Sequence, residues 1–264
     1  MAKQRKKAPE IDLSQALTVS ALDGRLNHTF APDVIQSFRY MATNLTLNNE
    51  LPARIALIAA LRGEGVTHTA VALGATIASD TGRRICVVEL NWWAPGMLNL
   101  LDPRRANLAT PKKKKKNMPS TESSEPLLPD LPRIEHVLAG EADLDAAIIH
   151  TNIPTLDLIP AGDIPVSRRP ATARCSTLRD VLTQLTKRYD HLLLDVPAVR
   201  ITSDAIVLAA LSSACIVVTQ QGTTSITPVQ QALDDVKTLS ILGVVLNKVT
   251  IYMPDWIRGL VPQD

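Results

Sequence analysis

The stretch 55–91 constrains the fold more than any other part of this chain. It predicts a buried strand at 55–60, a tight loop at 61–67, a helix at 68–81 and a second buried strand at 85–90. Short runs of Val, Ile and Leu on either side of a helix are typical of parallel strands that are buried on both faces. Such a strand-helix-strand unit is half of a doubly wound α/β sheet.

The loop of this unit places Gly63-Glu64-Gly65 at the start of the helix. Backbone N–H groups and the positive end of the helix dipole make such a loop a cradle for an anion. In a phosphate-binding P-loop, the next two residues are Lys and either Ser or Thr. Here they are Val66 and Thr67, so the lysine that contacts the phosphates is missing. The function of the protein depends largely on what that replacement means.

Composition places the chain among globular proteins. Its 264 residues, 45% of them hydrophobic, are enough for one large domain or two small ones with a sizeable core. The 28 basic and 26 acidic residues give a net charge of +2, which does not favour nucleic acid as a partner. Aromatic residues make up 3%, so we expect a core of Ala, Val, Ile and Leu, as in α/β layers.

The cysteines and the apolar segments bear on the compartment. Cys86, Cys175 and Cys215 are odd in number, far apart and without metal-ligand spacing, which predicts reduced core residues in a cytoplasmic protein. The basic N-terminus has no apolar segment behind it and is not a signal peptide. The longest apolar region, 205–219, is too short to span a membrane.

The rest of the chain continues the alternation of helices and strands. It predicts helices at 33–47, 134–140, 143–149, 176–188, 203–211 and 227–239, and strands at 156–159, 189–195, 214–219 and 241–247. Ser176 is the predicted N-cap of its helix. The pattern predicts an α/β fold with a mostly parallel sheet, helices on both faces and a ligand crevice at the carboxyl ends of the strands.

The chain divides into three segments, the second of which carries an insertion. Residues 1–31 are a flexible basic segment, and 32–250 form the domain, with a disordered Lys/Ser/Pro-rich insertion at 104–132. Residues 251–264 are a C-terminal tail. The five lysines at 112–116 are either a solvated loop or a contact with an anionic membrane or polymer.

Several short motifs occur in a characteristic order. They are QSFRYMATNL at 36–45, RGEGVTH at 62–68, ELNWWAP at 89–95, DVPA at 195–198 and VLNK at 245–248. In this order the chain from Pro32 to Val249 resembles the bacterial tyrosine kinases of capsule and exopolysaccharide assembly, a branch of the MinD/ParA-type P-loop ATPases. The resemblance implies a P-loop NTPase fold, a three-layer sandwich.

The resemblance also implies where the chemistry would lie. The family has P-G-E-G-K-S-T in the loop, D-x-D followed by R-R-P after the next strand, and D-T-P-P after the Walker B strand. Here Val66 replaces the lysine, Glu89 and Asn91 replace the two acids, and Trp93-Ala94 replaces the arginine pair. Phosphoryl transfer depends on positioning and neutralising the phosphates, so these losses predict an impaired catalyst.

Other residues of this site keep their chemistry. The resemblance makes Thr67 and Asp195 the Mg²⁺ residues if a nucleotide binds, and Asp195 with Glu89 the catalytic carboxylates. Nucleotide contacts would come from the loop residues Arg62, Gly63, Glu64, Gly65, Val66, Thr67 and His68, and from Asn247 at the base. Arg62 and His68 could each add a donor toward a phosphate, or be surface loop residues. Binding of ATP with Mg²⁺ is then expected to be weak.

The helix motif and the tail have also lost family features. The family's E-x-x-R-x-x-R reads Gln36, Arg39 and Ala42 here, so the charged contacts that would assemble a ring are mostly gone, while a homodimer stays open. The tail has Tyr252 alone in place of a tyrosine cluster. Trp256, Ile257 and Leu260 could pack on the domain, a partner or a membrane.

Three hypotheses follow. The first is a catalytically impaired, tyrosine-kinase-like protein that acts as a regulatory or scaffolding partner in capsular or exopolysaccharide synthesis or export. Its partner would be a membrane adaptor, and it would lie in the cytoplasm, at the inner face of the plasma membrane. The second is a divergent ATP-dependent protein tyrosine kinase or ATPase of the same pathway. The third is a MinD/ParA-like positioning ATPase, which is weakened by Leu61 at the position of that group's additional lysine.

Overall fold

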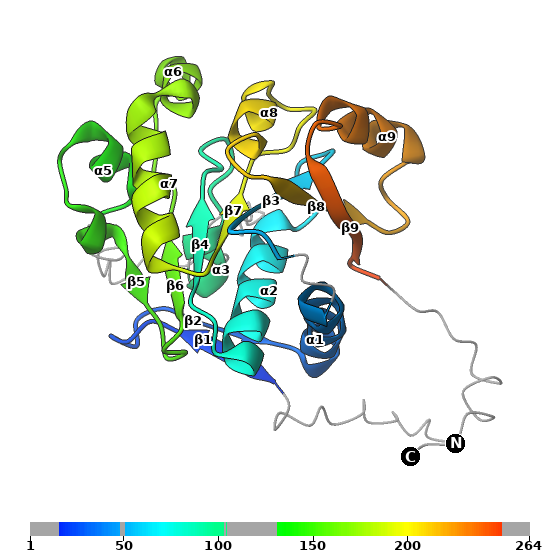
Figure 1. Cartoon of the computed structure of the whole chain (residues 1–264), viewed down its shortest axis with the longest axis horizontal. Helices are drawn as coiled ribbons and strands as arrows, with labels where there is room; N and C mark the ends of the chain where they lie inside the picture. Colours follow the sequence, from blue (N-terminus) through cyan, green and yellow to red (C-terminus); the bar gives the residue numbers. More distant parts are fainter. Residues whose placement is uncertain (1–15, 48–50, 103, 105–130, 250–264) are drawn as a thin grey trace, which may run out of the picture.

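A seven-stranded sheet forms the centre of the molecule (Figure 1). The computed structural model of the chain describes residues 16–47, 51–102, 104 and 131–249. The strands are β3 (Arg54–Ala59), β4 (Ile85–Glu89), β5 (Ile149–His150), β6 (Leu156–Ile159), β7 (His191–Asp195), β8 (Ala214–Gln220) and β9 (Ser240–Asn247). Their order is β5-β6-β4-β7-β3-β8-β9, and all pairs are parallel except β5 with β6. The predicted fold class, a mostly parallel α/β sheet, is confirmed.

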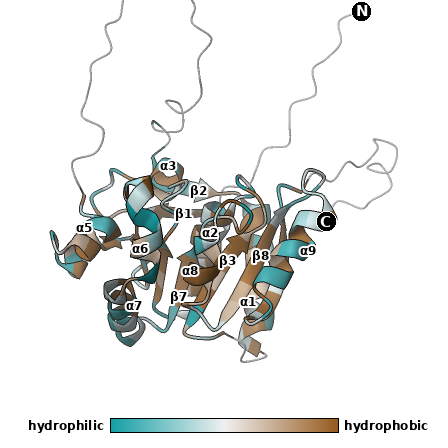
Figure 2. Ribbon diagram, turned by 90° about the horizontal axis from the view of Figure 1, so that it is seen from above, coloured by the Kyte–Doolittle hydropathy of each residue, from teal (hydrophilic) through white to brown (hydrophobic). Residues whose placement is uncertain are grey.

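Helices cover both faces of this sheet. One layer contains α1 (Pro32–Leu47), α2 (Val66–Thr81) and α3 (Met97–Leu101). The other contains α5 (Ile134–Ala139), α6 (Arg169–Arg174), α7 (Ser176–Arg188), α8 (Asp204–Ala209) and α9 (Ile226–Asp235). Two 3₁₀ turns, Leu144–Ala147 and Val166–Arg168, complete the second layer. Figure 2 shows the apolar central strands between helices whose outer faces are polar.

The strand order places three chemically important segments together. β4, β7 and β3 are neighbours, and Glu89 at the end of β4 pairs in register with Asp195 at the end of β7. Asp195 also pairs with Leu57 of β3, two residues before that strand ends. The carboxyl ends of parallel strands form one edge of a sheet, so the loop after β3 and both carboxylates meet there.

A β-hairpin lies within the segment 1–31 that the sequence predicts to be flexible. Strands β1 (Leu17–Ser20) and β2 (Asn27–Phe30) pair antiparallel, and Val19, Leu26 and Phe30 are buried in the core on the α2 side of the sheet. The folded domain therefore extends N-terminal of Pro32. Burial of these three side chains explains why so short a hairpin is held in place, since an isolated two-stranded hairpin is marginal.

The other differences from prediction are local. The N-cap of α7 is Cys175, whose Sγ accepts a hydrogen bond from the Leu178 N–H at 3.4 Å, so the prediction of Ser176 is wrong by one residue. The predicted helix at 143–149 is a 3₁₀ turn followed by β5. Gly140 ends α5 with φ 74°, as predicted for a glycine cap. Helices α3 and α6 were not predicted.

Several predictions fall outside the described residues. These are the lysine run at 112–116, nearly all of the insertion at 104–132, and the tail residues Tyr252, Trp256, Ile257 and Leu260. Of the helices in the described part, none has the length and apolar character needed to cross a bilayer.

Candidate functional site

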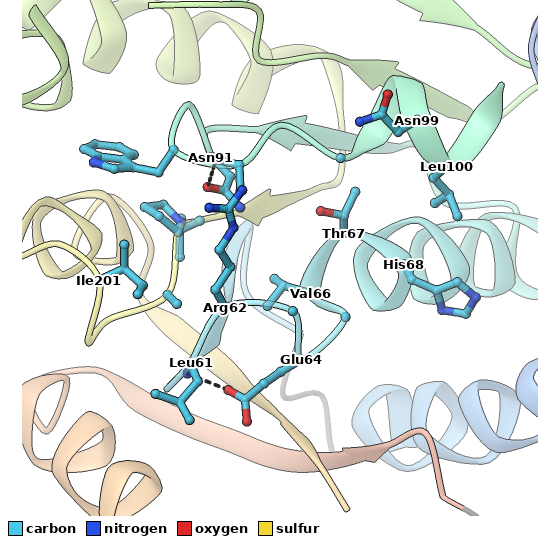
Figure 3. A pocket seen from close by; sticks show the side chains of 18 residues that line it. Leu61, Arg62, Glu64, Val66, Thr67, His68, Asn91, Asn99, Leu100 and Ile201 are labelled. Atoms are coloured by element: carbon cyan, nitrogen blue, oxygen red, sulfur yellow. Dashed lines mark hydrogen bonds between the residues drawn. The ribbon is translucent and has the colours of Figure 1, made fainter. Parts of the chain in front are cut away.

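The loop between β3 and α2 has the backbone of a phosphate cradle. Gly63 and Gly65 adopt φ of 85° and 95°, a region that residues with a Cβ rarely enter. No side chain caps the N-terminus of α2, so the first N–H groups of the helix are left for a ligand. The loop borders a cavity of about 540 Å³, which also contacts the segments after β4 and β7 (Figure 3).

Glu64 anchors this loop to the rest of the domain. Its carboxylate is buried and accepts hydrogen bonds from the Leu61 N–H at 2.7 Å and from the Thr219 and Thr224 hydroxyls. The backbone N–H of Gln220 also donates to it, at 3.4 Å. One carboxylate therefore ties the loop after β3 to the end of β8 and to the segment that follows it.

The end of β9 holds the same loop from another side. The Asn247 side chain donates from Nδ2 to the Glu64 carbonyl at 2.8 Å, and Lys248 donates from Nζ to the Gly63 carbonyl at 2.8 Å. Asn247 was predicted at a nucleotide base, and in the described structure its amide is engaged with the loop itself. We call Asn247 and Lys248 together the β9 latch.

The two glycines provide a matched test of this geometry. A Cβ on Gly63 would meet nothing within 4 Å, whereas a Cβ on Gly65 would lie 2.0 Å from Asn247 Nδ2. Gly63→Ala is expected to lower the free energy of unfolding by about 1–2 kcal/mol, the strain of a left-handed residue. Gly65→Ala should lose about 1 kcal/mol more, because Asn247 must move and give up its hydrogen bond.

Urea unfolding of both variants measures this difference. Adding Asn247→Ala to Gly65→Ala should then cause almost no further loss, since the latch bond is already broken. Equal losses at Gly63 and Gly65 would contradict the predicted clash.

The charge around the cradle is sparse. Val66, at the position of the P-loop lysine, is half-buried and lines the cavity. Arg62 is exposed, and its side chain extends over the cavity toward Asn91 (Figure 3). Among the described residues that line the cavity, Arg62 is the one Lys or Arg.

His68 forms part of an aromatic wall. Its ring lies 5.0 Å from that of Phe30 and 5.8 Å from that of His28, both on the N-terminal hairpin. Burial lowers the pKa of His68, and the nearby positive charge of His28 and Lys248 lowers it further. His68 is therefore neutral at pH 7 and offers a hydrogen-bonding ring rather than a charge.

Thr67 and Asp195 form the polar floor of the site. The Thr67 hydroxyl donates to Asp195 Oδ2 at 2.6 Å, while Asp195 Oδ1 is buried without a hydrogen-bond partner among the described residues. An orphaned carboxylate oxygen beside a hydroxyl fits Mg²⁺, which prefers oxygen ligands. Among the described residues there is no cluster of three His, Cys, Asp or Glu side chains that would form a separate metal site.

Burial raises the pKa of Asp195 well above its ordinary value, and the nearby Glu89 carboxylate raises it further. A carboxyl group whose pKa is higher in the folded state loses stabilising free energy as the pH rises through that pKa. Asp195→Asn removes this charge. The stability of the variant relative to the native protein is therefore expected to increase from pH 5 to pH 8.

Urea unfolding without Mg²⁺ measures this trend, and Asp190→Asn is its control. Arg84 lowers the pKa of Asp190, so that carboxylate stays charged from pH 5 to 8 and its variant should show no trend. If the difference in the free energy of unfolding between Asp195→Asn and the native protein does not change with pH, the pKa of Asp195 is not raised.

The Glu89 carboxylate is bound to backbone N–H groups and does not face the cavity. Its Oε1 accepts hydrogen bonds from the N–H groups of Gly96 and Met97 at the start of α3, and Oε2 accepts from Ala161 N–H at 3.0 Å. Burial raises the pKa of Glu89, although these N–H groups oppose the rise. Both carboxylate oxygens are thus occupied in the described structure, and Glu89 does not line the cavity.

The residues after Glu89 have separate roles. The Asn91 side-chain oxygen accepts a hydrogen bond from Ala94 N–H at 3.1 Å. Trp92 is fully buried, and its indole N–H donates to the Ala161 carbonyl at 3.1 Å. Trp93 lines the cavity, and the guanidinium carbon of Arg169 lies 5.7 Å from its ring centroid. Trp92 is a core residue, while Trp93 forms part of the wall.

Arg39, the arginine that remains from the family's helix motif, has its partner within this chain. Arg39 donates to both oxygens of Asp80 on α2, at 2.7 and 3.2 Å. Ala42 is buried in the core, and Gln36 is exposed. The remaining arginine of the motif therefore pairs with a neighbouring helix of its own chain.

Sequence reasoning found the loop, Thr67 and Asp195, which the structure brings together. It missed the clamp on Glu64 by Thr219 and Thr224 and the role of Lys248. These partners lie at least 155 residues from the loop in sequence, and single Thr and Lys residues carry no local signal.

The geometry defines the class of the protein. A glycine-rich loop between β3 and α2, with Thr67 at the start of the helix bonded to Asp195 at the end of β7, matches the phosphate loop of P-loop NTPases, with Val66 at the position of the loop lysine. No family model matches the chain. The Tyrosine-protein kinase CpsD of Streptococcus pneumoniae serotype 4 (strain ATCC BAA-334 / TIGR4) is 33% identical over 117 residues, which cover 43% of this chain and 51% of that kinase.

Solved structures agree at the level of the fold. The kinase domain of Escherichia coli tyrosine kinase ETK superposes with a TM-score of 0.63 and 16% identity, covering 83% of this chain and 79% of that one. Cobyrinic acid a,c-diamide synthase from Mycobacterium smegmatis with bound ATP analog and magnesium gives 0.52 and 20%, covering 74% and 75%. The chain is a relative of the bacterial tyrosine kinases, and it spans about half the length of the curated relatives it matches first.

Proposed function

We propose that this protein is a catalytically impaired relative of the bacterial tyrosine kinases. It acts as a regulatory or scaffolding partner in the synthesis or export of capsular or exopolysaccharide. The observation that carries the proposal is the loss of charge within one cavity whose backbone is intact. Val66 brings an aliphatic side chain to the phosphate position, and Asn91 is neutral. Beside the cavity, the carboxylate of Glu89 accepts hydrogen bonds from three backbone N–H groups instead of facing the phosphate position.

The size of this loss supports a scaffold over an efficient enzyme. Phosphoryl transfer works through positioning and neutralisation of phosphate charge, and removing one such donor typically lowers a rate about 10²- to 10³-fold. Here the loop lysine is replaced by Val66, the arginine pair by Trp93-Ala94 and one acid by Asn91, so several charged groups are missing at once. Glu64 and the β9 latch hold the loop through hydrogen bonds within the chain. A preformed surface of this kind suits recognition by a protein partner.

A second candidate function is a divergent ATP-dependent tyrosine kinase or ATPase. The pair Thr67–Asp195 favours it, because the hydroxyl and the orphaned Oδ1 would hold Mg²⁺ if ATP bound. Arg62 would supply the cation that Val66 does not, since a guanidinium binds phosphate oxygens well. The synthase with the same fold, solved with an ATP analog and magnesium, supports nucleotide binding in general. ATP would supply the transferred phosphoryl group.

The setting of the protein is part of the proposal. The relatives are named tyrosine-protein kinases CpsD and wzc. Together with the resemblance to the kinases of capsule and exopolysaccharide assembly, they suggest a membrane adaptor as the partner and the cytoplasmic side of the membrane as the location. A homodimer is compatible with this role. Nucleic acid is not favoured by a net charge of +2.

Titration of the full native chain with a fluorescent ATP analogue and Mg²⁺ tests the proposal. We expect no saturable binding in the micromolar range, no ATP turnover and no phosphotyrosine after incubation with ATP. An Arg62→Ala variant, assayed in parallel, distinguishes the second candidate, which requires that arginine. Micromolar binding with turnover that Arg62→Ala abolishes would overturn the scaffold function and establish the divergent kinase.

A further inference from the structure

A groove between α1 and β9 is the second notable feature of the surface. Its volume is about 800 Å³, larger than that of the cavity at the phosphate loop. Val34, Phe38 and Met41 line it from α1, and Val245 and Leu246 line it from β9. In Figure 1, β9 lies at the edge of the sheet with α1 beside it. The groove therefore lies at the edge of the sheet that β9 forms.

Apolar side chains around this groove are exposed. Tyr40 is 74% exposed, Leu246 58% and Val249 47%. Within the described residues no strand pairs with the outer edge of β9. An unpaired strand edge and a row of exposed apolar side chains normally mark a surface that another segment covers.

The chain itself leads into this groove. Val249 lines it and is the last described residue, and 15 residues follow, 250–264. Lys248 has a left-handed φ of 54°, which is typical of a residue at a chain reversal. A segment attached at the mouth of a groove has a high effective concentration there, so modest contacts are enough for it to bind.

The composition of that segment fits an apolar groove. Seven of its residues are large and apolar: Ile251, Tyr252, Met253, Trp256, Ile257, Leu260 and Val261. The two other long segments outside the described residues, 1–15 and 105–130, are rich in Lys, Arg, Ser and Pro instead. Spacing of Trp256, Ile257 and Leu260 at one, three and four residues would place them on one helical face.

We propose that residues 250–264 pack into the groove between α1 and β9 of their own chain, with Trp256, Ile257 and Leu260 as the anchors. The tail then covers the outer edge of β9. It also lies against the β9 latch, since Asn247 and Lys248 line the groove as well as holding the phosphate loop.

Hydrogen–deuterium exchange of the full chain tests this packing. At a concentration where light scattering reports a monomer, backbone amides at 251–261 are expected to be protected at least about tenfold relative to an unstructured peptide. Tyr40→Asp and Leu246→Asp place a charge on the two walls of the groove and should each abolish that protection. Val166→Asp is the matched control, because Val166 is 72% exposed and lies outside the groove, and it should leave the tail unchanged.

Thermal melting checks that the variants stay folded. Trp256→Asp changes the contact from the side of the tail and should abolish the same protection. Unprotected tail amides in the native monomer would overturn the proposal. So would protection that appears only in a dimer, which assigns the groove to a second copy. Protection that appears only with phosphatidylserine vesicles would assign the tail to a lipid surface and overturn it equally.

Discussion

Val66→Lys should raise the affinity for ATP and Mg²⁺ about 30-fold or more. A charged group that meets its partner in a desolvated site typically contributes about 2–5 kcal/mol, and about 1.4 kcal/mol corresponds to a factor of ten. Val66 is the first residue of α2 and lines the cavity, so a lysine there starts beside the free N–H groups of the cradle. Lysine is also the better helix former of the two. Titration with a fluorescent ATP analogue measures the change.

Val66→Met is the matched control, because methionine has similar length and no charge. It should bind ATP no better than the native chain. Equal gains from Met and Lys would assign the effect to shape rather than charge. Failure of a folded Val66→Lys variant to bind would show that the missing lysine is not what limits this site.

Glu89→Ala should lower the free energy of unfolding by about 3 kcal/mol. The substitution leaves the N–H groups of Gly96, Met97 and Ala161 buried without an acceptor, and each such group costs about 1–3 kcal/mol. Relief of the repulsion with Asp195 offsets part of this loss. For a domain of this size, the melting temperature should fall by roughly 6–12 °C.

Two further variants separate the causes. Glu89→Gln keeps one acceptor oxygen and should lose less than Glu89→Ala. Glu141→Ala, at an exposed glutamate, should stay within about 0.5 kcal/mol of the native chain. A negligible loss for Glu89→Ala would mean that water replaces the carboxylate at no cost, and that the carboxylate does not organise the start of α3.

The sheet was predictable because its signal is local. Runs such as those of β3, β4 and β8 are apolar over at least four consecutive residues, and α7 shows a clear helical period. The hairpin was not predictable, since β1 and β2 are four residues each and carry Thr, Ser, Asn and His. Packing of Val19 and Phe30 against the core, not strand propensity, holds them.

Some parts of the site could likewise be predicted from the sequence, and others could not. The loop and Asp195 follow from short motifs, and the strand order brings them together. The roles of Glu89 and Asn91 depend on which N–H groups face them, and the contacts of Lys248 depend on a residue 185 positions away. The long-range contacts of Glu89 with Ala161 and of Lys248 with Gly63 leave no trace in spacing or composition.

The hydrogen bonds that hold Glu64 affect which surface a partner would recognise on this protein. In a nucleotide switch, the bound γ-phosphate orders neighbouring loops, so the surface reports which nucleotide is bound. Here Thr219, Thr224 and the β9 latch hold the loop through hydrogen bonds within the chain, on the side away from the phosphate position. Such a surface would present the same face in a starved and a growing cell, as a constant reference point rather than a signal.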